Sequence, residues 1–148
     1  MTIAEQLTED MKTSMKAGTA DRTGALRLLR SAIKNEEIKL GHALSDDEAL
    51  KLLQREAKQR RDSIEQYQAA GRDELAAVEE AELAIIGAYL PQPLTEAELK
   101  ALVAEVATAQ GATTPAQMGA VIGEVMRRAG ARAEGGAVSR LAREQLSA

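Results

Sequence analysis

Apolar side chains recur every three or four residues along the first part of the chain, which is the spacing of a helix with one buried face. The first stripe consists of Ile3, Leu7, Met11 and Met15. It predicts a helix over residues 2–16 that Gly18 ends. A second helix is expected after a cap at Asp21 and before a break at Gly41-His42. Its apolar positions are Leu26, Leu29, Ile33 and Leu40.

A capping box and two prolines set boundaries of the next two predicted helices. Ser45 and Glu48 have the S-x-x-E spacing in which each side chain accepts a hydrogen bond from the backbone of the other residue. A third helix is therefore predicted from Ser45 to Ala70. A fourth helix over residues 73–90 ends before the Pro91-Gln92-Pro93 segment, because proline lacks a backbone donor and disfavours helix in the residue before it.

Three shorter helices are predicted after the prolines. Thr95 with Glu98 forms a second capping box, and the helix that follows stops at Gly111. Thr114 as the cap and Pro115 in the first helical position open a sixth helix. A seventh begins at about Gly136. Their inward positions include Leu99, Val103, Val106, Met118, Val121, Val125, Val138, Leu141 and Leu146.

No segment alternates apolar and polar residues with period two, so the fold class is predicted to be all-α. The short loops favour antiparallel neighbours. We expect an N-terminal domain of four helices, with long helices, over residues 1–91. A proline hinge joins it to a three-helix tail domain over residues 92–148.

Composition supports helices and excludes several kinds of site. The chain is 45% hydrophobic without any Phe or Trp, and it has no Cys and one His. Thiol chemistry, a Ser/His/Asp relay and a His/Cys metal cluster are thus excluded. No catalytic residue, metal ligand or cofactor is predicted. No apolar run approaches the ~20 residues of a membrane span, and a cytoplasmic location without membrane contact is expected.

Charge is unevenly distributed along the chain. The formal net charge is −4, so attraction to nucleic acid requires a local patch. Residues 1–90 hold 13 Lys/Arg against 17 Asp/Glu, whereas residues 114–148 hold five Arg against three Glu. The tail loop is therefore the favoured RNA-binding site, with three guanidiniums at a bend and glycine amides at a helix start. Its residues are Arg127, Arg128, Arg132, Gly135, Gly136, Arg140 and Arg143.

Two ordinary structural explanations for these basic residues compete with an RNA-binding site. The arginines after residue 126 can simply cap a helix C-terminus beside a glycine-rich turn. The basic stretch of the third helix has an acid one turn from most of its cations, as an ordinary solvated helix does. Arg60 is the exception, because it lies on an apolar face where it needs a partner or a ligand anion. The second-choice binding residues are Arg27, Arg30, Lys34, Lys58, Arg60, Arg61 and Arg72.

Several segments together resemble the YqeY-like family over essentially the whole chain. They are Lys58-Gln59-Arg60-Arg61-Asp62-Ser63-Ile64, Ala70-Gly71-Arg72-Asp73-Glu74-Leu75, Tyr89-Leu90-Pro91, Met118-Gly119, Gly123-Glu124-Val125-Met126 and Arg143-Glu144-Gln145-Leu146. From about Gln92 onward the chain also resembles the C-terminal tail of the B subunit of tRNA-dependent amidotransferase. In the tail loop, Arg132, Gly135 and Val138 match that pattern.

The resemblance implies a helical domain followed by a tail similar to a tRNA-contacting appendage, with no counterpart of the catalytic portion of the amidotransferase. A carbon-nitrogen ligase activity with glutamine as amide donor would then belong to a partner. The expected function is a tRNA-associated accessory protein that works with amidotransferase subunits. The alternative is a helical protein-protein adaptor that binds no RNA. DNA is not an expected partner, and the oligomeric state is left open.

Overall fold

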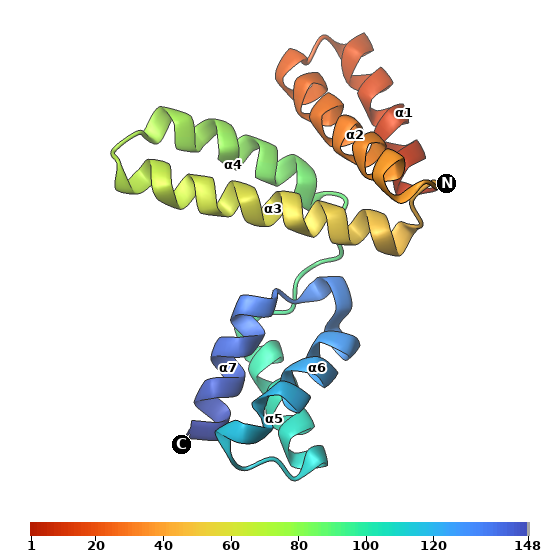
Figure 1. Ribbon diagram of the computed structural model, residues 1–148. Helices are drawn as coiled ribbons and strands as arrows, with labels where there is room; N and C mark the ends of the chain where they lie inside the picture. Colours follow the sequence, from red (N-terminus) through yellow and green to blue (C-terminus); the bar gives the residue numbers. More distant parts are fainter. Residues whose placement is uncertain (148) are drawn as a thin grey trace. The chain divides into compact units, whose positions relative to one another are not determined.

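The computed structural model describes residues 1–147 and is helical throughout (Figure 1). Its α-helices are α1 Ile3–Ala17, α2 Ala20–Leu40, α3 Asp46–Ala69, α4 Asp73–Gly87, α5 Glu96–Gln110, α6 Met118–Ala129 and α7 Gly135–Ser147. Two short 3₁₀ turns, η1 Pro115–Gln117 and η2 Gly130–Arg132, flank α6. No strand occurs in the described residues, so the all-α prediction is confirmed.

The chain divides into two compact units, Met1–Leu90 and Pro91–Ala148. The first unit contains α1 to α4 and the second contains α5 to α7. Each unit has its own cluster of buried apolar side chains. The two units are therefore described separately.

In the first unit, two helical hairpins pack on each other. The helices α1 and α2 lie side by side and antiparallel, as do α3 and α4 (Figure 1). Their shared core is aliphatic and includes Leu7, Leu26, Leu29, Leu53 and Ile86, each at most 1% exposed. After α4, the Tyr89 hydroxyl donates a hydrogen bond to Asp10 of α1. Burial and this bond raise the pKa of Tyr89 above its ordinary value.

The second unit packs α5, α6 and α7 around valine and leucine side chains. Val103, Val106, Val121, Val125 and Val138 are at most 1% exposed. The helix α7 contacts both α5 and α6. This unit therefore buries the same apolar stripes that the helical spacing predicts.

The helix starts predicted at Ser45, residue 73 and Thr95 agree with the structure, whereas the start of α2 differs. The boxes at Ser45 and Thr95 are present. The predicted cap at Asp21 is wrong, because α2 already begins at Ala20. Hydroxyl groups hold this turn instead: Ser14 Oγ lies 2.7 Å from Thr23 Oγ1, and Thr19 Oγ1 donates to the Ser14 carbonyl.

Two further boundaries shift by a few residues. The helix α4 ends at Gly87, and residues 88–90 form turns, including a bond from Tyr89 N to the Ile86 carbonyl. Pro91 disfavours helix just before it, which accounts for the early end. The predicted start at Thr114 opens η1 rather than α6, which begins at Met118.

Candidate functional site

Glu124 of α6 holds two of the predicted RNA-binding arginines. Arg127 Nε and Nη2 lie 2.9 and 2.6 Å from the Glu124 carboxylate, and Arg128 Nε lies 2.9 Å from it. Arg127 and then Arg128 lower the pKa of Glu124 to about 2 through these bonds. Arg128 also lies 3.7 Å from Glu105 of α5. Both guanidiniums are therefore bound to acids of their own chain.

Arg132 points to a different place, the segment that precedes α5. Its Nε donates to the Gln92 carbonyl at 2.8 Å, and its own carbonyl accepts from Leu94 N at 2.9 Å. Its Nη2 lies 4.0 Å from Glu98. Arg132 therefore fixes residues 92–94 on the second unit.

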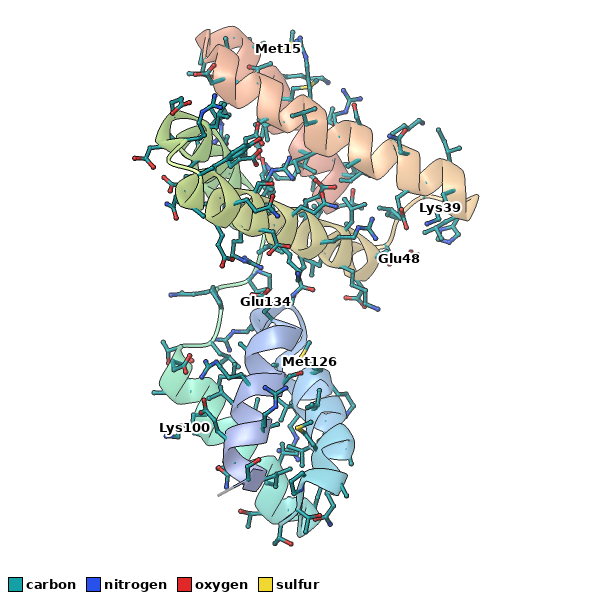
Figure 2. The ribbon with its side chains drawn as sticks, turned by 60° about the vertical axis from the view of Figure 1, so that its left-hand side comes forward. Met15, Lys39, Glu48, Lys100, Met126 and Glu134 are labelled. Carbon is teal, nitrogen blue, oxygen red and sulfur yellow. The ribbon has the colours of Figure 1, made fainter. Side chains whose placement is uncertain are left out.

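The remaining tail-loop residues lie on α7 or at its start. Arg140 bridges Glu96 of α5, at 2.7 Å, and Glu144 of α7, at 3.2 Å. Arg143 is exposed and has no ion pair within the described part of the chain. Gly135 and Gly136 form the exposed first turn of α7. Met126 and Glu134 mark α6 and the start of α7 in Figure 2.

The three guanidiniums expected at one bend do not converge. Arg127 and Arg128 share Glu124, whereas Arg132 binds elsewhere. The predicted surplus of positive charge is also removed, because α5 brings three glutamates to these arginines. They are Glu96, Glu98 and Glu105. Residues 91–148 hold six Lys/Arg and six Asp/Glu, so the second unit is formally neutral. Whether the tail loop binds RNA stays a prediction.

Three of the second-choice residues also have ion pairs, namely Lys58, Arg60 and Arg72. Lys58 lies 3.3 Å from Asp62, and Arg72 lies 2.8 Å from Glu74. Arg61 is exposed on α3. Arg60 finds the partners that its apolar surroundings require, because its 12% exposed side chain lies 2.6 Å from Glu56 and 3.2 Å from Glu82. Arg60 therefore links α3 to α4 through its ion pair with Glu82.

Arg27, Arg30 and Lys34 form the basic stripe of α2, which differs from the sites above. All three side chains are exposed. Within residues 1–147 no carboxylate lies within ion-pair distance of any of them. They line one side of a groove whose other side is α1. The sequence shows the stripe, but not the groove.

Two structural features are absent from the part of the chain that the structure describes. In residues 1–147, no three His, Cys, Asp or Glu side chains lie close enough together to hold a metal ion. Across the same residues, no helix has the length and apolar character needed to cross a bilayer.

The model of a family described as Yqey-like protein matches residues 4–146. Curated relatives named "Altered inheritance of mitochondria protein 41, mitochondrial" are also similar to this chain. The one from Saccharomyces cerevisiae is 37% identical over 91 residues, which are 61% of this chain and 49% of that protein. The one from Lachancea thermotolerans is 39% identical over 105 residues, 69% of this chain and 56% of that protein. The chain thus spans about half the length of these relatives.

These names overturn the predicted cytoplasmic location, which is wrong on this comparison because the relatives are named as mitochondrial proteins. The prediction rested on the lack of long apolar runs. That feature bears on crossing a bilayer, whereas a compartment is chosen by targeting segments that receptors read.

Proposed function

This chain belongs to the YqeY-like family, and from that premise we propose that it is an RNA-associated accessory protein without an active site of its own. Its RNA partner is a tRNA, and it acts beside a glutamine-dependent amidotransferase whose other subunits perform the chemistry. The resemblance of residues from about 92 onward to the tail of the amidotransferase B subunit supports this link. The Pro91-Gln92-Pro93 segment joins the two units.

The observation that supports RNA binding at the tail loop is the exposure of the ion pairs that its arginines form with glutamates. The side chains of Arg127, Arg128 and Arg140 are 72%, 36% and 46% exposed. Exposed ion pairs contribute little net stability, so a phosphate group can replace a glutamate at such a guanidinium. Because a carboxylate must first leave, we expect weak binding that depends strongly on salt.

The test is the affinity of the full chain for bulk tRNA between 50 and 200 mM salt. Changing Arg127→Ala with Arg128→Ala removes two phosphate contacts, so the affinity should fall roughly three- to tenfold and the salt slope should decrease by about 1.5. Arg132 is left unchanged, because it holds Gln92. Glu124→Gln removes the carboxylate that both guanidiniums share, while Glu105 remains beside Arg128, and should strengthen binding.

Two results would count against the proposal. Absence of tRNA binding at 50 mM salt would defeat RNA association as a whole. Unchanged binding in both the arginine pair variant and Glu124→Gln would remove only the tail loop as the site.

A second candidate function is a protein-protein adaptor. The observation in its favour is apolar exposure on α2 of the first unit, where Ile38 is 71% and Leu28 54% exposed. Apolar contacts strengthen rather than weaken with kosmotropic salt. A protein partner that stays bound at high salt, from material without RNA, would favour the adaptor.

A further inference from the structure

The basic stripe of α2 has the spacing of a single helix face. Arg30 follows Arg27 by three residues and Lys34 follows Arg30 by four, so the three side chains lie one above the other. Seven residues of helix span about 10.5 Å. Met15 and Lys39 mark the two ends of the α1–α2 hairpin that carries the stripe (Figure 2).

The stripe borders a groove with a volume of about 570 Å³. The opposite wall belongs to α1 and carries small or apolar side chains, namely Ala4, Thr8 and Met11. Glu37 is the one acid among the described residues that line the groove. Its carboxylate accepts a hydrogen bond from Leu44 N at 3.0 Å, at the far end of α2. One wall of the groove is therefore cationic and the other nearly uncharged.

The guanidiniums of the stripe approach sulfur rather than carboxylate. Arg27 Nη2 lies 4.0 Å from Met15 Sδ, and Arg30 Nη1 lies 3.8 Å from Met11 Sδ. A thioether is a neutral, weak acceptor, so it steadies the guanidinium without cancelling its charge. The tail arginines Arg127, Arg128 and Arg140 lie at glutamates instead. An anion that enters the groove has no carboxylate to displace from the stripe.

We propose that the α1–α2 groove binds the sugar-phosphate backbone of RNA, with Arg27, Arg30 and Lys34 each facing a phosphate of one strand. That the polymer is RNA rests on the function proposed above; the site itself is separate from the tail loop. The three cations spread over about 10.5 Å of helix, so they can face successive phosphates of one strand, whereas a single small anion would not span them.

The groove reads charge and shape rather than base identity. Recognition of unpaired bases relies on aromatic side chains for stacking. The chain has no Phe or Trp, and neither of its two Tyr lines the groove. We therefore expect similar affinity for tRNAs of different sequence and a strong dependence on salt.

The experiment measures binding of the full chain to bulk tRNA by fluorescence anisotropy at 50, 100 and 200 mM salt. The groove variant is Arg27→Ala with Arg30→Ala, which should keep α2 intact because both positions are exposed and alanine favours helix. We expect its affinity to fall roughly tenfold at 100 mM salt and its salt slope to decrease by about 2. Circular dichroism checks the helix content.

A matched variant controls for net charge. Lys12→Ala with Arg55→Ala also removes two cations from the first unit, but these cations are already paired with Glu9 and Glu36. Its affinity should stay within about twofold of the unchanged chain, because no phosphate contact is lost.

Each outcome decides a different point. If the groove variant and the charge control lose affinity equally, or neither loses any, the groove is not the site. If the groove variant alone loses affinity while the Arg127/Arg128 variant binds normally, the groove is the RNA site and the tail loop is not. If the unchanged chain binds no tRNA at 50 mM salt, the proposed function fails, and the RNA occupant with it.

Discussion

At the scale of single residues, the partner of each cation decides what it can do. Arg60 and Arg30 both follow helical apolar spacing in the sequence. In the structure the Arg60 side chain is only 12% exposed and lies between two glutamates, whereas Arg30 is exposed beside a methionine sulfur. The same type of side chain thus links two helices in one place and is a candidate for binding an anion in the other.

Replacing Arg60 by Ala should destabilise the first unit by about 2 kcal/mol. The change leaves Glu56 and Glu82 close together and only 19% and 23% exposed, without their cation. Breaking a fully buried pair costs about 3–5 kcal/mol, and partial exposure reduces that figure. Urea unfolding followed by circular dichroism measures the effect.

Lys58→Ala on the same helix is the matched control. Lys58 and Asp62 are 59% and 55% exposed, so its loss should change the free energy of unfolding by less than about 0.5 kcal/mol. Equal effects of the two changes would contradict a structural role for Arg60.

At the scale of elements, local capping decides where helices start. The helix α3 begins directly after Ser45, whose side chain accepts from Glu48 N at 3.2 Å while Glu48 accepts from Ser45 N at 3.1 Å. The Asp21 cap failed because α2 begins one residue before Asp21, with Thr19 in the capping position and bonded to Ser14. That contact joins α1 to the turn and is not visible in helical spacing.

Ser45→Ala should lower the stability of the first unit by about 1 kcal/mol, because the first turn of α3 loses the acceptor for one of its free amides. Ser45→Asp should restore most of that stability, since aspartate caps as well as serine. Thermal unfolding of the three chains tests this order. A Ser45→Asp chain as unstable as Ser45→Ala would show that the cap is not the cause.

At the scale of the whole molecule, two separate cores stabilise the chain. Leu53, 0% exposed, belongs to the first core, and Leu141, 3% exposed, belongs to the second. No residue is shared between the two clusters. Damage to one core should therefore leave the other largely intact.

Leu141→Ala should destabilise residues 91–148 by about 3 kcal/mol, through lost burial and the cavity left behind. Leu53→Ala should do the same to residues 1–90. Hydrogen exchange with mass spectrometry reports which amides lose protection. Loss of protection across the whole chain in either variant would show that the two cores unfold as one unit.

The helices can be predicted from the sequence, because spacing, capping boxes, glycine and proline act within a few residues of each other. The all-α class, the starts at Ser45 and Thr95, and the resemblance to the family follow from these local signals and motifs. Which arginines are paired depends on tertiary packing. Glu96, Glu98 and Glu105 precede the arginines that they pair with by 23 or more residues, yet packing brings α5 beside α6 and α7. Electrostatic attraction depends on distance in space rather than on separation in the sequence. Glutamates of α5 therefore neutralise the basic tail loop, while the stripe on α2 has no ion pair within the described residues.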